Sequence, residues 1–172
     1  MKTTLTLLVA IASMLAVAPS QAATQDRRAQ HLPGNMCQLS IPTTDTKVRP
    51  KATGFRNEGT QSAFVICSFP SAEGGIGSAI SQELYFYSID GVARTLNCTA
   101  VAGEFPGSSD SVYLTQSITV SETLPNNDFL YYSPADFGYT TYLPESFSVT
   151  CILPPNTAIR SGYTNSVTDV GS

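Results

Sequence analysis

The sequence predicts an all-β protein: an antiparallel two-sheet sandwich or jelly roll of about eight or nine short strands with two disulfides. Beyond residue 36, short apolar runs are separated by Gly, Pro, Asn or Asp about every ten residues, a spacing typical of sandwiches. No stretch repeats apolar residues at positions i, i+3, i+4 and i+7 over three turns, so long helices are not expected. The third observation is a set of four widely spaced cysteines, Cys37, Cys67, Cys98 and Cys151.

The chain is predicted to have three parts. Residues 1–22 have the pattern of a secretory signal peptide, with Lys2, an apolar run over 5–18 and small residues before a cleavage point at the end. That run is shorter than the roughly 20 residues needed to cross a bilayer, so no membrane insertion is expected after cleavage. Residues 23–35 are polar without periodicity and are predicted to be a flexible N-terminal tail. Residues 36–172 then form one β-sandwich domain.

Alternation of apolar and polar residues predicts the clearest strands. The expected inward-facing sets are Val112, Leu114, Ile118 and Val120; Phe147, Val149, Cys151 and Leu153; and Val92, Leu96, Cys98 and Ala100. The runs 63–69 and 84–89 are apolar on both faces, which favours central strands. Weaker strands are expected over 37–41, 53–57, 129–132 and 158–168. Asp90-Gly91, directly after the run 84–89, predicts a tight type I′ hairpin to the next strand.

Each cysteine lies on the apolar side of its own strand, so all four side chains are expected to face inward. Export to an oxidising compartment then predicts two structural disulfides. Three pairings are open from the sequence. We favour Cys37–Cys67 with Cys98–Cys151, because neither bridge then crosses the other along the chain. A zinc site is disfavoured, since structural zinc uses close cysteine pairs and these cysteines lie about 30 residues or more apart.

The charge distribution argues against two classes of partner. The net charge is −4, and only 13% of the residues are charged. Beyond Lys51 the basic residues Arg56, Arg94 and Arg160 are far apart in the chain, so no basic stripe is available for a phosphate backbone. A nucleic-acid partner is therefore not expected. The same scarcity leaves no polybasic segment for an anionic membrane surface.

No catalytic constellation is recognisable. The single histidine, His31, falls in the predicted tail, which excludes Ser-His-Asp, Cys-His and multi-histidine metal chemistry. Two carboxylates would suffice for glycoside hydrolysis, but nothing selects two of the candidates Glu58, Glu73, Glu83, Glu104, Asp110, Asp128 and Asp136. Oxygen ligands for Ca²⁺ occur over 126–128 and 108–110, without EF-hand spacing. The sequence thus predicts no cofactor and no enzymatic activity, and it leaves Ca²⁺ open.

Aromatic residues gather in the segment 129–142. Tyrosines on a sandwich loop can stack on sugar rings or anchor a protein partner, because the ring is apolar and the hydroxyl is polar. The alternative is that these side chains fill one end of the sandwich. If a surface of this chain binds a ligand, the sequence favours the tyrosines Tyr131, Tyr132, Tyr139 and Tyr142.

Three segments carry a family resemblance: Gly54-Phe55-Arg56-Asn57 with Cys67 ten residues on, Leu96-Asn97-Cys98, and Cys151-Ile152-Leu153-Pro154-Pro155. Over roughly residues 36–172 the chain resembles small exported bacterial proteins with four cysteines, mostly uncharacterised, which look like β-sandwiches. The resemblance implies the fold and the export, and it carries no catalytic residues.

These observations lead to three functional hypotheses. The favoured one is a secreted or periplasmic, non-enzymatic β-sandwich with a structural or interaction role. The second is a carbohydrate- or protein-binding module that uses the tyrosines above. The third is a hydrolase with two carboxylates. The sequence does not specify the natural ligand or partner.

Overall fold

The computed structural model describes residues 23–41, 47–70, 79–103, 109–121, 123 and 128–170. The predicted signal peptide, residues 1–22, lies outside the described residues. Within them the chain forms eleven strands, the short helix α1 and the 3₁₀ helix η1. The elements are β1 (Thr24–His31), α1 (Pro33–Met36), β2 (Cys37–Leu39), β3 (Val48–Lys51), β4 (Gly54–Asn57), β5 (Ala63–Phe69), β6 (Ala79–Ser88), β7 (Arg94–Gly103), β8 (Val112–Val120), β9 (Phe129–Tyr132), η1 (Pro134–Phe137), β10 (Ser146–Leu153) and β11 (Thr157–Asp169).

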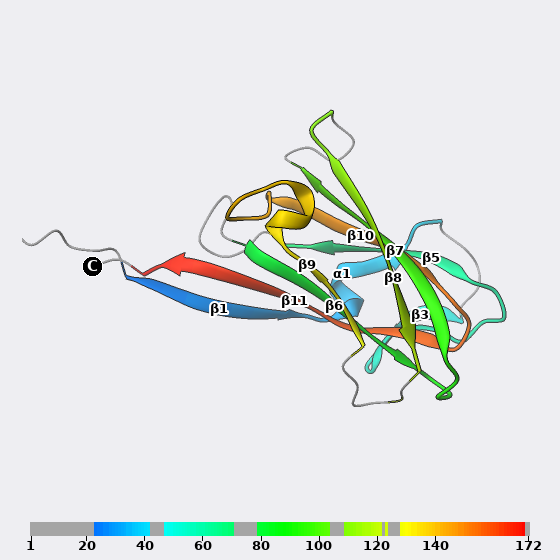
Figure 1. The fold of residues 1–172 in the computed structure, drawn as a ribbon. Coiled ribbons are helices and arrows are strands. Elements are labelled where there is room, and N and C mark those ends of the chain that lie inside the picture. Colours follow the sequence, from blue (N-terminus) through cyan, green and yellow to red (C-terminus); the bar gives the residue numbers. More distant parts are fainter. Residues whose placement is uncertain are drawn as a thin grey trace, which may run out of the picture.

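The strands form two antiparallel sheets, which confirms the predicted sandwich class (Figure 1). One sheet, here called the β11 sheet, has the strand order β3-β4-β11-β6-β9, and β1 also pairs with β11. The other, here called the disulfide sheet, has the order β2-β5-β10-β7-β8. Two strands, β1 and β3, were not predicted, because their short polar sequences show no apolar alternation.

The core lies between the two sheets and follows the alternation of the strands that line it; β1, with its exposed side chains, contributes none of it. From the β11 sheet it receives Phe55, Leu84, Phe86 and Ile159, each at most 2% exposed. From the disulfide sheet it receives Val65, Leu96, Val120, Val149 and Leu153, each at most 1% exposed. The predicted inward set of 147–153 is therefore confirmed. Val92 is an exception to the prediction around Cys98, because it is exposed and precedes β7.

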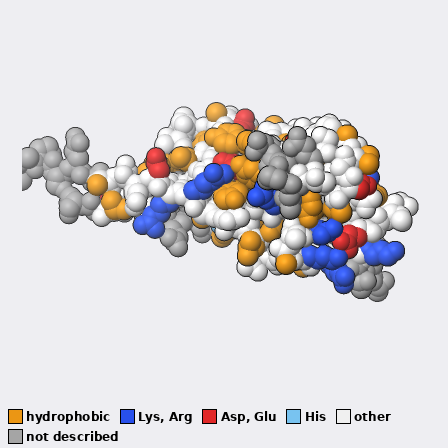
Figure 2. Space-filling model, turned by 90° about the horizontal axis from the view of Figure 1, so that it is seen from below, with side chains coloured by type: hydrophobic (Ala, Val, Ile, Leu, Met, Phe, Trp, Pro, Cys, Tyr) orange, Lys and Arg blue, Asp and Glu red, His pale blue; other side chains and the backbone are white. Residues whose placement is uncertain are grey.

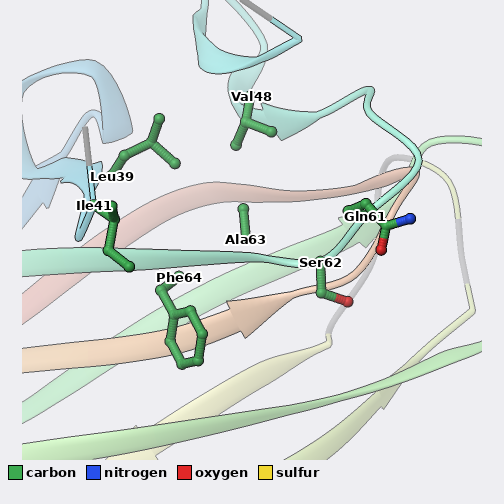
Figure 3. Close-up of a pocket in the computed structure, with 7 residues that line it drawn as sticks. All are labelled: Leu39, Ile41, Val48, Gln61, Ser62, Ala63 and Phe64. Atoms are coloured by element: carbon green, nitrogen blue, oxygen red, sulfur yellow. The ribbon is translucent and has the colours of Figure 1, made fainter. Parts of the chain in front are cut away.

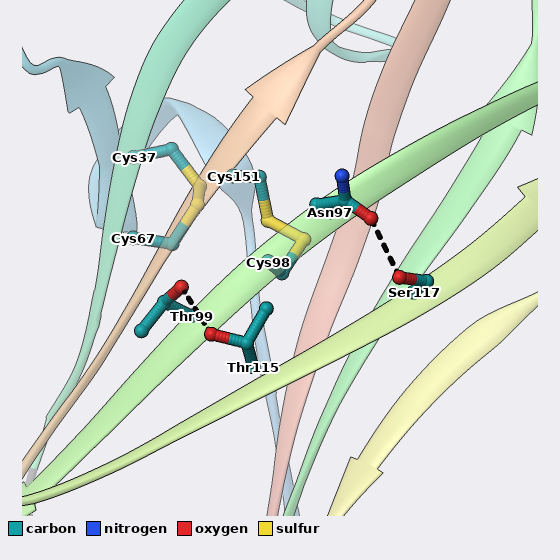
Figure 4. The surroundings of a disulfide bond; sticks show 8 residues. All are labelled: Cys37, Cys67, Asn97, Cys98, Thr99, Thr115, Ser117 and Cys151. Carbon is teal, nitrogen blue, oxygen red and sulfur yellow. Dashed lines mark hydrogen bonds between the residues drawn. A yellow bond between two sulfur atoms is a disulfide. The ribbon is translucent and has the colours of Figure 1, made fainter.

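Both disulfides form as the sequence favoured, Cys37–Cys67 and Cys98–Cys151. Each joins two directly opposed residues of neighbouring strands in the disulfide sheet, and the Cα atoms of each pair lie 4.0 Å apart. The bridges therefore tie β2 to β5 and β7 to β10, and they do not cross from one sheet to the other. Hydrogen-bonded pairs such as Thr99–Thr115 continue the ties across β7 and β8 (Figure 4).

The predicted hairpin at Asp90-Gly91 is wrong, because β6 belongs to the β11 sheet and β7 to the disulfide sheet. The turn is real, and Gly91 has the positive φ of 75° that favours glycine. Asp90 organises it: its carboxylate accepts hydrogen bonds from the Val92 backbone N–H and, at two oxygens, from the Arg94 guanidinium. The ion pair with Arg94 holds the pKa of Asp90 well below its usual range. A local turn signal thus marks a crossing between layers.

The predicted flexible tail over 23–35 also needs correction. Residues 24–31 form β1, which pairs with β11 from Thr24 opposite Asp169 to His31 opposite Gly162. Together the two strands extend beyond the body of the sandwich as a two-stranded arm (Figure 1). Nearly every side chain of β1 is exposed, so its sequence has no alternation of apolar residues that would predict a strand. Backbone pairing with β11 defines it instead.

His31, expected to be solvated in that tail, packs against the body of the protein. Its Nε2 lies 2.8 Å from the Thr164 hydroxyl, which itself donates to the Gln82 side-chain carbonyl at 2.6 Å. Nε2 is therefore the donor in its contact with Thr164. The imidazole also meets the Phe69 ring edge-to-face at 6.1 Å between centroids. Burial lowers the pKa of His31 below its ordinary value of 6.5.

Removing either disulfide should destabilise the fold through the freedom returned to the unfolded chain. Cys98→Ala with Cys151→Ala opens a loop of 53 residues, and Cys37→Ala with Cys67→Ala one of 30. We expect losses of about 4 and about 3.5 kcal/mol in the free energy of unfolding, respectively. Urea denaturation of the oxidised protein and both double variants would measure them. Four free thiols in the oxidised protein would contradict the two disulfides. Urea midpoints of the double variants equal to that of the wild type would contradict their stabilising role.

The stability of the protein should fall as the pH drops below about 6.5, in part because of His31. The unfolded chain binds a proton there, whereas the folded imidazole, with its lowered pKa, resists protonation until lower pH. On a change from about pH 7.5 to about pH 5.5, His31→Gln should therefore lose less thermal stability than the wild type. Differential scanning calorimetry at the two pH values gives the comparison. Equal losses in the two proteins would show that His31 does not contribute.

Candidate ligand-binding face

The tyrosines singled out by the sequence do not form one group. Tyr131 and Tyr132 are neighbours in β9, and strand alternation sends them to opposite sides. Tyr131 is 48% exposed, whereas Tyr132 is 0% exposed and packs against the rings of Phe137 and Phe147. Burial raises the pKa of the Tyr132 hydroxyl. Tyr132 therefore belongs to the core and offers no area to a ligand.

The other two predicted tyrosines follow η1 and belong to no strand. Tyr139 is partly buried against the core, and Tyr142 is exposed. The capping of η1 fixes this region: the Asp136 carboxylate accepts from the backbone N–H and the hydroxyl of Ser133. Of the four tyrosines, Tyr131 alone lies on a sheet surface.

That surface is the outer face of the β11 sheet, where the register brings three strands into rows. Tyr131 of β9, Glu83 of β6 and Tyr163 of β11 are directly opposed in one row. Phe129, Tyr85 and Ser161 form the next row, about 7 Å along the strands. We call the four rings Tyr85, Phe129, Tyr131 and Tyr163 the aromatic face.

The rings of the aromatic face support one another. Tyr85 stacks on Phe129 with centroids 4.8 Å apart and planes 18° apart. It also meets Tyr163 edge-to-face at 5.3 Å. Phe129 keeps 38% of its area exposed beside the exposed Tyr131. Rigidly packed rings of this kind lose little conformational freedom when a ligand lands on them.

A buried carboxylate sits in the middle of the aromatic face. The Glu83 side chain is only 11% exposed, and its Oε2 accepts from Arg28 Nη2 at 2.6 Å and from the Tyr85 hydroxyl at 2.8 Å. Its Oε1 accepts from Asn165 Nδ2 at 2.7 Å. The Arg28 guanidinium also lies 4.2 Å from the centroid of the Tyr163 ring. Burial raises the pKa of Tyr85, and the neighbouring Glu83 raises it further, so this hydroxyl stays protonated and donating.

These contacts decide what the face can do. Glu83 uses both oxygens to hold Arg28, Tyr85 and Asn165, which suits a positioning role better than proton transfer. What remains open to solvent is aromatic surface bordered by hydroxyls and a guanidinium. Such a surface can stack on the C–H face of a sugar ring and exchange hydrogen bonds with its hydroxyls. A face of this composition is suited to binding a ligand.

The other acidic candidates are placed apart from this face or outside the described residues. Glu58 pairs with Lys51 and Arg56, and Asp136 caps η1. Glu73, Glu104 and three of the six Ca²⁺ candidate ligands (Ser108, Asn126 and Asn127) lie outside the described residues, whereas Asp110 accepts from the Ser109 hydroxyl. Across the part of the chain that the structure describes, no group of three or more His, Cys, Asp or Glu side chains could hold a metal ion.

A small hollow opens at another place, between the disulfide sheet and β3 (Figure 3). Its volume is ≈ 240 Å³, and it is lined by Leu39, Ile41, Val48, Gln61, Ser62, Ala63 and Phe64. The lining is largely apolar and contains no charged side chain. Residues 42–46, which follow Ile41 directly, lie outside the described residues, so this hollow supports no functional assignment.

No family model matches the sequence, and a search of curated proteins finds no similar one. None of the helices in the described ranges is long and apolar enough to cross a membrane. The functional assignment therefore rests on the geometry of the face.

Sequence reasoning missed most of the aromatic face. Phe129 shares strand parity with the exposed Tyr131, and Tyr85 alternates with the buried Leu84 and Phe86, so this part of the signal was visible. Their meeting with Tyr163 depends on β6 lying between β9 and β11, an order that no local pattern encodes. Arg28 was missed because it lies in the segment that was predicted to be a tail.

Glu83 should matter for stability because three donors converge on it. Glu83→Gln replaces one acceptor oxygen by an NH₂ group and removes the charge that pairs with Arg28. We expect the free energy of unfolding to fall by about 1–2 kcal/mol, and the β1 amides to exchange faster with solvent. Denaturation and hydrogen exchange give both readouts. Glu145→Gln, the same change at an exposed position, serves as the control; an equal effect there would refute a special role for Glu83.

Proposed function

We propose that this chain is an exported, non-enzymatic binding protein of the periplasm or cell exterior, and that the aromatic face binds carbohydrate. One observation carries the proposal: partly exposed rings from three strands are held on one sheet surface around a hydrogen-bonded carboxylate. The predicted signal peptide and two disulfides support a compartment outside the cytoplasm. The resemblance to exported bacterial four-cysteine sandwiches agrees with that location and adds no ligand.

The chemistry of the face favours a sugar. Exposed aromatic area at Phe129 and Tyr131 matches the apolar face of a pyranose ring. The Arg28 side chain is half-exposed although it is anchored to Glu83, so it can still donate to a ligand oxygen at the edge of the rings. A protein partner would also use tyrosine and arginine, but it would need a wider buried patch around them.

A glycan array with the mature protein, followed by calorimetry on the best ligand, tests the proposal. Tyr131→Ala should weaken binding about 5- to 30-fold, the equivalent of roughly 1–2 kcal/mol for a contacting aromatic side chain. Tyr113→Ala is the matched control, because Tyr113 is an exposed tyrosine of the disulfide sheet. Both proteins should keep the wild-type melting temperature.

Two results would overturn the proposal. One is the absence of binding to any glycan on the array. The other is a glycan whose affinity Tyr113→Ala reduces while Tyr131→Ala leaves it unchanged, because that pattern would move the site to the disulfide sheet.

A further inference from the structure

A cluster of cations lies on the β3–β4 hairpin and has no part in the face described above. Lys47, Arg49, Lys51 and Arg56 are four of the nine basic residues of the chain, and they fall within ten positions. Over the same stretch to residue 58 the sequence has one acid, Glu58. The protein as a whole is acidic, so this concentration of positive charge is local. We call residues 47–58 the basic hairpin.

The register places the basic hairpin on the same side of the sheet as the aromatic face. Arg49 is directly opposite Arg56, which is opposite Ala158, which is opposite Tyr87. Tyr87 lies two residues beyond Tyr85 in β6, so the two project from the same face. The row that contains Arg49 and Arg56 therefore adjoins the row of Phe129, Tyr85 and Ser161, about 7 Å along the strands.

The space-filling view agrees with this arrangement. Figure 2 shows Lys and Arg side chains gathered toward one end of the molecule with acidic atoms among them. Hydrophobic side chains, with basic and acidic ones beside them, gather nearer the middle of the same view. A single ligand crossing this side of the molecule would meet both.

Within the basic hairpin a single acid, Glu58, is shared among several cations. Glu58 contacts Lys51 and Arg56, and these cations lower its pKa, the hydrogen bond from Lys51 most of all. Arg49 and Arg56 nonetheless stand directly opposite each other on neighbouring strands. Like charges in that position repel and destabilise a sheet. An arrangement that keeps them close is one that an anionic ligand would relieve.

We propose that the aromatic face and the basic hairpin together bind an acidic polysaccharide, with sugar rings on the rings of Tyr131 and Phe129 and acid groups at Arg49 and its neighbours. This inference rests on the proposed carbohydrate binding and names the ligand class. Guanidinium groups bind carboxylate, sulfate and phosphate through paired hydrogen bonds, so all three acids fit. The local positive field would also draw the ligand to this end of an otherwise acidic protein.

The test compares four polymers with one backbone: dextran, carboxymethyl-dextran, dextran sulfate and dextran phosphate of equal length. The acidic forms should bind the mature protein about tenfold more tightly than neutral dextran at low salt. Their advantage should shrink severalfold between about 0.05 and 0.5 M NaCl, as the Debye length shortens. The ranking of the three acidic forms identifies which acid group the site prefers.

Two variants locate the effect. Arg49→Glu should weaken the binding of the acidic polymers about tenfold and leave the affinity for neutral dextran unchanged. Arg27→Glu is the control with the same change of charge, since Arg27 alternates with Arg28 in β1 and projects from the opposite side. It should leave all four affinities within about twofold of the wild type.

The outcomes separate this inference from the proposed function. One outcome is equal affinity for neutral and acidic dextrans, with binding of both lost in Tyr131→Ala. It would overturn the preference for an acidic ligand and leave the proposed carbohydrate binding in place. If Arg49→Glu and Arg27→Glu reduced the affinity for the acidic polymers equally, the effect would be one of overall charge. That result would overturn the basic hairpin as the binding site. Single-stranded DNA that binds as tightly as dextran sulfate, with the same dependence on Arg49, would overturn the polysaccharide as ligand. Failure to bind any of the four polymers would overturn this inference, while the glycan array decides the proposed function on its own.

Discussion

The position of β11 is the constraint on which the candidate site depends. This strand of 13 residues pairs with β6 along one edge and with β4 and then β1 along the other. Close packing defines where β4 begins: a Cβ on Gly54 would clash with the carbonyl oxygen of Ile159, and the φ of +136° at Gly54 also favours glycine. The register fixed by these pairings brings Tyr163 beside Tyr85 and places the basic hairpin on the same side.

The disulfide sheet serves this arrangement as a firm second layer. Its two bridges flank the pairing of β5 with β10, so four of its five strands are joined by one continuous set of hydrogen bonds and cystines. The inner side of that layer supports the core beneath β6 and β9, where Tyr132 and Phe147 meet. The outer aromatic rings therefore rest on a packed interior, which keeps them in place for a ligand.

The fold class and the cystines could be predicted because both follow from local chemistry. Alternation over 147–153 and the parity of the cysteines report directly which side chains are buried. The strand β1 could not be predicted in this way, because an edge strand with exposed side chains needs only backbone partners. Asp90-Gly91 likewise predicted a turn, but a local turn signal does not tell which sheet the following strand joins. The candidate site is harder still: Tyr131 was identified from its sequence neighbourhood, but its true companions come from β6 and β11, which only the strand order brings together.

The central claim is that ligand contacts lie on the outer face of the β11 sheet. Backbone amide chemical shifts of the ¹⁵N-labelled protein, recorded by NMR during titration with dextran sulfate, test this most directly. The account predicts that the shifts which change lie in β6, β9, β11 and the basic hairpin. Changes centred instead on the exposed threonine rows of β7 and β8, or spread evenly over both sheets, would contradict it.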